Sequence, residues 1–292
     1  MMNDSSISAL QAAVNPLGLD GLEFVEYSTA DPETFGALLV RMGFVRVARH
    51  RSRRVFLYRQ SSINVIVDAD PEVLRATTSK PGEVVLSALA FRVADAGLAY
   101  RALLDQGAWP IPTRAEAMEL NIPGVHGVGD SILYLVDRYR DFSIYDVDFA
   151  FEPDIDRHPP ALAGLHVYGV TQVVGAGRID EWFDFYAQLF GFVLDVRAAD
   201  AGPGDDVVLC SPCAGLRLRL VELPDDLSRD EHWDESYGCL LLGAPDVDAA
   251  VQVLRDRGVE FAPPRPGGGI RTRVDPSGVQ FELIADAKAT AP

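Results

Sequence analysis

The sequence predicts an α+β protein in which four βαβββ modules pair into two half-open β-barrel domains. The first observation is a unit of apolar strand, short turn and amphipathic helix that recurs four times and ends each time at a glycine. These glycines are Gly43, Gly107, Gly191 and Gly258, at spacings of 64, 84 and 67 residues. The second observation is that three more apolar segments follow the first helix. A long repeat of this kind indicates one supersecondary unit used several times.

The first module shows the elements of the unit in order. Residues 22–27 fit a period of two, in which Leu22, Phe24 and Glu26 alternate with Glu23, Val25 and Tyr27, and this predicts a strand. A helix follows, with Asp31 as N-cap, Pro32 in its first turn and Gly43 as C-cap. Residues 44–70 then hold three apolar segments separated by polar turns: FVRVARHR, RVFLYRQ and SSINVIVDAD. Two such units commonly pair their sheets, so we expect each pair to form one concave wall.

The remaining modules divide the chain into two domains. The other three copies of the unit are FRVADAGLAYRALLDQGAW, VVGAGRIDEWFDFYAQLFGFV and LGAPDVDAAVQVLRDRGVEF. Between the second and third copies lies FEPDIDRHPPALA, whose three prolines and mixed charge are typical of a linker. The expected organisation is an arm at 1–20, an N-terminal domain at 21–150, the linker at 151–163, a C-terminal domain carrying the site at 164–286, and a tail at 287–292.

The composition favours small molecules as partners. A net charge of -17 argues against nucleic acid, because a phosphate backbone requires a basic face, and against an anionic membrane surface. No segment approaches the roughly 18 apolar residues that a membrane span needs, and the start MMNDSSISAL lacks the features of a signal peptide. Three cysteines provide no disulfide framework. We therefore expect a cytoplasmic protein that binds small molecules or further copies of itself.

Long stretches of the chain resemble the 4-hydroxyphenylpyruvate dioxygenase family of the vicinal oxygen chelate superfamily. The first half carries NPLGLDGLEFVEYS, RHRSRRVFLYRQSSINVIVDADP, MELNIPGVHGVGDSILYLVDRY and SIYDVDF, in the family's order. The second half carries TQVVGAGRIDEWFDFYAQLFGF, YGCLLLGAPDVDAAVQVLRDRGVEF and GVQFELI. The resemblance implies the vicinal oxygen chelate fold, chemistry in the second half and a homo-oligomer.

The resemblance also implies an Fe(II) site with two histidines and one carboxylate, and this chain departs from it. The carboxylate position is Glu282, but the second histidine position holds Cys239, and the first falls on Gly169 or its neighbour Val170. The family further has a C-terminal helix over the pocket. We expect this helix to be missing, because the sequence ends eight residues after Ile284.

Arg219 is the residue that we expect to replace the metal. It occupies the repeat position equivalent to Glu282, and its side chain is expected on the same face of the strand as those of Arg217 and Val221. A buried glutamate alone would be strongly disfavoured as an anion, whereas an adjacent guanidinium would neutralise it. Arg219 would then either lock Glu282 in place or hold a substrate carboxylate.

The other candidate residues favour ordinary structural roles. Cys210 and Cys213 form a CxxC at a predicted strand end, which indicates a turn rather than a redox pair or zinc site. His166 is expected on the opposite strand face from the ligand position unless a bulge turns it inward, and His232 lies in a polar loop. Glu26 is expected to be a structural carboxylate. The first-half positions equivalent to the pocket are apolar, and so predict no metal site: Phe24, Ile66, Ala88 and Leu135.

Three functions remain open. The first is a metal-independent enzyme of lyase or isomerase type that acts on a small aromatic or 2-oxo-acid metabolite and needs no cofactor. Its catalytic residues would be Glu282, Arg219 and Cys239, and its substrate-binding residues would be Arg217, Val221 and Gly169. The second is an Fe(II)-dependent 4-hydroxyphenylpyruvate-type dioxygenase with His166, Cys239 and Glu282 as an unusual ligand set. The third is a metal-free protein that binds and sequesters a small molecule.

Overall fold

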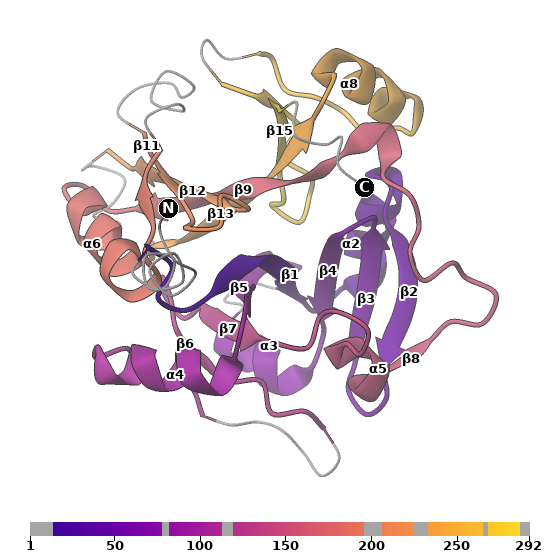
Figure 1. The fold of residues 1–292 in the computed structure, drawn as a ribbon. Coiled ribbons are helices and arrows are strands. Elements are labelled where there is room, and N and C mark those ends of the chain that lie inside the picture. The colour runs from indigo at the N-terminus through magenta and orange to yellow at the C-terminus, as the bar shows by residue number, and fades with distance from the viewer. Residues whose placement is uncertain are drawn as a thin grey trace, which may run out of the picture.

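A computed structural model describes residues 14–77, 82–112, 119–195, 206–224, 233–264 and 268–286. Within them the strands form two mixed, open sheets with helices packed on their faces (Figure 1). None of the helices described there is both long enough and apolar enough to cross a membrane. The predicted α+β fold with paired, half-open sheets is confirmed.

The first sheet contains eight strands among the described residues, in the order β6-β7-β5-β1-β4-β3-β2-β8. Its strands are β1 (Leu19–Thr29), β2 (Val45–His50), β3 (Val55–Gln60), β4 (Ile63–Asp68), β5 (Val84–Val93), β6 (Gly124–His126), β7 (Ile132–Val136) and β8 (Phe149–Phe151). The helices of this half are α2 (Pro32–Arg41), α3 (Pro71–Thr77), α4 (Ala96–Asp105) and α5 (Ile144–Asp148). The central strands β1 and β5, which begin the two modules, run antiparallel.

The second sheet has the order β10-β11-β12-β9-β13-β15-β14 over the described residues. Its strands are β9 (His166–Val174), β10 (Val193–Leu194), β11 (Val207–Cys210), β12 (Arg217–Glu222), β13 (Ser236–Ala244), β14 (Ile270–Arg271) and β15 (Phe281–Ala285). The helical segments are η1 (Leu162–Gly164), α6 (Ile179–Phe190) and α8 (Val247–Asp256). Again the first strands of two modules, β9 and β13, pair antiparallel at the centre.

The four long helices begin and end close to the predicted positions. The Asp31 side chain accepts a hydrogen bond from the Thr34 backbone N–H at 3.1 Å, so it caps α2 as expected. The C-cap of α2 is Met42, one residue before the predicted Gly43, which lies just beyond it at a φ of +97°. Only glycine adopts that conformation without strain, so the repeated glycine marks the residue where the chain leaves each helix.

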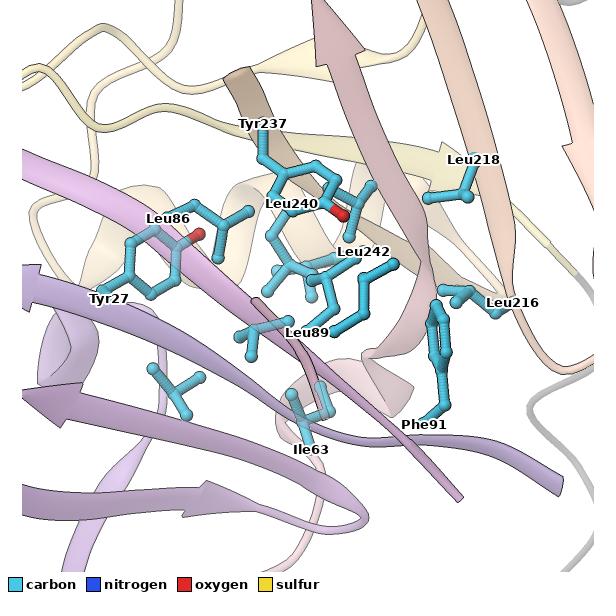
Figure 2. Packing of buried hydrophobic residues seen from close by; sticks show 14 of the residues in the cluster. Tyr27, Ile63, Leu86, Leu89, Phe91, Leu216, Leu218, Tyr237, Leu240 and Leu242 are labelled. Atoms are coloured by element: carbon cyan, nitrogen blue, oxygen red, sulfur yellow. The ribbon is translucent and has the colours of Figure 1, made fainter. Parts of the chain in front are cut away.

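One apolar core joins the two sheets. Figure 2 shows side chains of β1 and β5 meeting those of β12 and β13, with Leu89 and Leu242 close together at the centre. These contacts bury Tyr27, Leu86, Leu89, Phe91, Leu218, Tyr237, Leu240 and Leu242. Because alternate residues of a strand point to opposite faces, the other face of each sheet points away from the shared core. We call these surfaces the first cup and the second cup.

The strand register decides which residues face each cup. In the second sheet Val170, Leu218, Leu240 and Phe281 belong to the shared core, so their neighbours Gly169, Arg219, Cys239 and Glu282 face the second cup. In the first sheet, Phe24 and Ile66 belong to a separate apolar cluster on the cup side. The expectation for Leu135 was wrong, because it lies in the shared core and Tyr134 faces the first cup instead. Tyr134 pairs with Ala90 of β5, which belongs to the same cup-side cluster, and this register decides which residues of β7 face the first cup.

Candidate functional site

Glu282 and Arg219 meet in the second cup, which is the first of the two arrangements that the sequence leaves open for Arg219. They come from β15 and β12, which are separated in the sheet by β9 and β13. Nη1 of Arg219 lies 2.9 Å from both carboxylate oxygens of Glu282. The exposed fraction is 3% for Arg219 and 0% for Glu282. Thus the repeat-equivalent positions form a buried ion pair.

A second guanidinium, which the sequence analysis missed, completes the environment of Glu282. Nε of Arg271 donates to Oε2 at 3.0 Å, and the backbone N–H of Gly269 donates to Oε1 at 2.9 Å. Arg271 lies directly opposite Glu282 in the two-residue strand β14. The only signal in the sequence was the alternation of Arg271 with Arg273, which by itself also fits an exposed edge strand.

The charges at this cluster are unequal, since two guanidiniums share one carboxylate. Burial raises the pKa of Glu282, but the attraction of Arg219 and Arg271 and the hydrogen bonds outweigh it, so this pKa lies below its ordinary value. Nε of Arg219 is buried and has no hydrogen-bond partner among the residues that the structure describes. The cluster therefore carries a positive surplus together with an unused donor.

Cys239 lies beside the cluster as a protonated thiol. It is 8% exposed, and its sulfur lies 3.6 Å from the hydroxyl of Thr171. Burial, followed by the negative charge of Glu282, raises the pKa of Cys239. A raised pKa makes the thiol a poor nucleophile near neutral pH, because the thiolate is the reactive form.

The three predicted substrate-binding residues lie on β9 and β12. Gly169 is opposite Arg217, and a Cβ atom added to Gly169 would lie 2.3 Å from the carbonyl oxygen of Arg217. Nε of Arg217 donates to Asp195 at 2.8 Å, and its guanidinium lies over the ring of Tyr168. Val221 is half-buried on the same face of β12. Arg217 therefore already has partners, and Gly169 is required for the close approach of two strands.

His166 does not join Cys239 and Glu282. It lies opposite Gly243 at the start of β9, where its Nε2 is 3.2 Å from Asp286 and its Nδ1 is 3.2 Å from the carbonyl oxygen of Gly164. The β13 neighbour of Glu282 is Leu241, two residues before Gly243, so His166 lies farther along the sheet. The alternative ligand set is thus not brought together.

The remaining sequence candidates are the two cysteines of the CxxC and His232. Cys210 ends β11 and Cys213 lies in the following turn, where its sulfur is 3.2 Å from the hydroxyl of Ser211. His232 lies outside the described residues. Over the described ranges, no group of three His, Cys, Asp or Glu side chains could together hold a metal ion.

The residues of the second cup do not fit an iron centre with two histidines and one carboxylate. The first histidine falls on Gly169 or Val170; Val170 lies in the shared core, and at Gly169 the carbonyl oxygen of Arg217 leaves no space for a side chain. The position of the other is Cys239, which is buried and offers a thiol in place of an imidazole. Both oxygens of the carboxylate are already hydrogen-bonded to cationic or amide donors.

Paired βαβββ modules around two open cups define the fold class that glyoxalases and dioxygenases share. Two family descriptions match the halves: the N-terminal domain of hydroxyphenylpyruvate dioxygenase over residues 13–150, and the glyoxalase/bleomycin resistance protein/dioxygenase superfamily over 168–283. The chain belongs to the 4-hydroxyphenylpyruvate dioxygenase family of the vicinal oxygen chelate superfamily, as its relatives show.

Two relatives span most of the chain. Hemolysin VllY of Vibrio vulnificus (strain CMCP6) is 39% identical over 265 residues, which cover 86% of this chain and 74% of the relative. The 4-hydroxyphenylpyruvate dioxygenase of Pseudomonas aeruginosa is 35% identical over 265 residues, which cover 85% and 72%. A variant of 4-hydroxymandelate synthase from Streptomyces coelicolor shares the fold, with a TM-score of 0.68, 18% identity and coverage of 91% and 92%.

Proposed function

We propose that this chain is a metal-independent member of its family and binds a small aromatic or 2-oxo acid in the second cup. The observation that carries this proposal is the pairing of Glu282 with two guanidiniums. Each of its oxygens already accepts at least two hydrogen bonds, which occupy the lone pairs that a metal would need.

Electrostatics supports the same conclusion. A divalent cation about 4 Å from one guanidinium is repelled by roughly 8 kcal/mol at an effective dielectric constant of about 20. Arg219 is almost fully buried, so solvent screens this repulsion little. The guanidiniums of Arg219 and Arg271 together with the single carboxylate of Glu282 therefore favour an anionic ligand over a metal cation.

The unused donors suit a carboxylate ligand. Nε of Arg219 is buried without a partner, and Arg271 uses only Nε toward Glu282 in the described contacts. A guanidinium binds a carboxylate through two parallel hydrogen bonds, which gives orientation as well as affinity. An acid would therefore neutralise the positive surplus of the cluster.

The geometry favours binding over catalysis by the predicted residues. A carboxylate whose pKa is lowered is a weak general base, and a buried thiol whose pKa is raised is a weak nucleophile. Glu282 is thus better suited to hold the two guanidiniums in place than to transfer a proton. Cys239 is better suited to packing than to nucleophilic attack. This leaves the role of a small-molecule-binding protein as the best supported function.

The first test asks whether the protein holds iron or consumes oxygen. Purified protein is incubated anaerobically with Fe(II), desalted and analysed for metal, and oxygen uptake is then followed with 4-hydroxyphenylpyruvate. The Pseudomonas aeruginosa dioxygenase serves as the positive control. We expect iron well below one atom per chain and no oxygen uptake. Stoichiometric iron with substrate-dependent oxygen uptake would overturn the proposal.

The second test asks whether the acid binds through Arg271. Calorimetric titration with 4-hydroxyphenylpyruvate is compared with the matched ketone 4-hydroxyphenylacetone, which lacks the carboxylate. We expect the acid to bind at least tenfold more tightly, and Arg271→Met to remove this preference, because a charge-assisted hydrogen bond contributes about 1.5–3 kcal/mol. The control is Arg273→Met, whose guanidinium pairs with the exposed Glu260 instead. Equal affinity for both compounds would refute the carboxylate role.

A further inference from the structure

The first cup contains a cavity that the second-cup proposal does not use. Its volume is about 480 Å³, within the range of small-molecule sites. Strands of both modules and the helix α5 line it, so the same fold that places Glu282 in the second cup provides an open space in the first.

The deep wall of this cavity is apolar and aromatic. The ring centroids of Phe24 and Tyr134 lie 5.9 Å apart, and Phe149 lies against both His50 and Tyr145. The aliphatic part of the wall comprises Val55, Ile66, Ile132 and Ile144. Such a wall fits a molecule with an aromatic ring, because the ring buries apolar area and meets the wall rings edge to face.

The most informative polar group in the cavity is the carboxyl of Asp148, at the end of α5. The residue is 8% exposed, and its Oδ1 accepts a hydrogen bond from the backbone N–H of Leu120 at 3.1 Å. No hydrogen bond to its Oδ2 is present among the described residues. Burial raises the pKa of Asp148, so the carboxylate lacks full compensation. A ligand that donates a hydrogen bond to Oδ2 would supply it.

The charge of the lining selects a cationic donor. The described lining contains five carboxylates, Glu26, Asp68, Glu119, Asp130 and Asp148, and one arginine, Arg53. Arg53 is paired with Glu119 through its guanidinium. An ammonium group would gain from this field, whereas a carboxylate would be repelled.

We propose that the first cup is a second ligand site, which takes a small aromatic amine with its ring among Phe24, Tyr134 and Phe149 and its ammonium group against Asp148. This site is separate from the second cup, and the inference does not rest on the function proposed there. The protein would then bind two ligands of opposite charge in two cups of the same fold.

Calorimetry with matched probes tests the site. The probes are 2-phenylethylamine and 2-phenylethanol, which share the ring and chain and differ in charge. We expect the amine to bind with one site per chain and at least tenfold more tightly than the alcohol. Equal affinity of the two probes, or no binding of the amine, would overturn the proposal.

Variants locate the binding. Asp148→Asn keeps an oxygen for the Leu120 N–H and removes the charge, so we expect the amine affinity to fall at least tenfold. The matched control is Asp105→Asn, at the exposed end of α4, which should leave the affinity unchanged. Ile66→Trp should fill the cavity and abolish binding, provided circular dichroism shows a folded protein.

A last variant separates the two cups. Arg271→Met is expected to leave the amine affinity unchanged, because the amine is placed in the other cup. Amine binding that survives Asp148→Asn unaltered, or that disappears with Arg271→Met, would contradict the assignment even if the acid binds as proposed above.

Discussion

Replacing Glu282 by glutamine tests whether the buried cluster is an ion-pair lock. The substitution keeps the size of the side chain but leaves the guanidiniums of Arg219 and Arg271 without their carboxylate. Removing one partner of a buried pair costs about 3–5 kcal/mol, because the remaining charge stays desolvated. We therefore expect a large loss of stability without any change in side-chain volume.

This loss can be measured as a shift in melting temperature. An unfolding entropy of about 2.1 cal/mol/K per residue corresponds to about 0.6 kcal/mol/K for the 292 residues, if the chain unfolds in one transition. The expected decrease in Tm for Glu282→Gln is therefore about 5–8 °C, by calorimetry near neutral pH.

The matched control for this experiment is Glu260→Gln. Glu260 pairs with Arg273 at 2.9 Å, but the two side chains are 69% and 68% exposed. An exposed pair of this kind contributes little, so the control should lower Tm by no more than about 2 °C. A Tm for Glu282→Gln as high as that of the control would refute the lock.

Three further predictions concern pH, packing and reactivity. The folded pKa of Glu282 lies below its ordinary value of 4.5, so the unfolded chain binds more protons in acid. The stability difference between the wild type and Glu282→Gln should therefore be complete above about pH 4.5 and shrink as the pH falls further, in acid-titrated melts. Gly169→Ala should lower Tm by about 2–5 °C, because its Cβ would meet the Arg217 carbonyl oxygen and force the strands apart, at about 1–3 kcal/mol. In timed iodoacetamide labelling followed by peptide mass spectrometry, Cys239 should react after the half-buried Cys210, since burial keeps it protonated. Equal labelling rates would contradict that assignment.

Features that depend on neighbouring residues or on the repeat follow from the sequence. The Asp31 cap and the glycines after the helices depend on a few neighbouring residues, so their positions follow from sequence to within about one residue. Arg219 and Glu282 occupy equivalent positions in two modules, so the repeat placed both in one site, and the structure decides between the two roles left open for Arg219 by pairing it with Glu282. Leu135 was misplaced because strand parity depends on the pairing of β7 with β5, which lies far away in sequence.

The amino-acid sequence by itself determined the repeated fold, the family and the placing of Arg219 and Glu282 at equivalent positions, because periodicity, caps and equivalent positions can be read along the chain; that the two side chains pair was decided by the tertiary structure. Only the tertiary structure decided that Arg271 also holds Glu282, that Asp286 holds His166, and that the open cavity lies in the first cup. Each of these depends on which strands lie side by side and in what register. Such contacts join residues from distant segments or across an irregular loop. Their geometry is fixed only when the strands have paired and the two sheets have packed against each other.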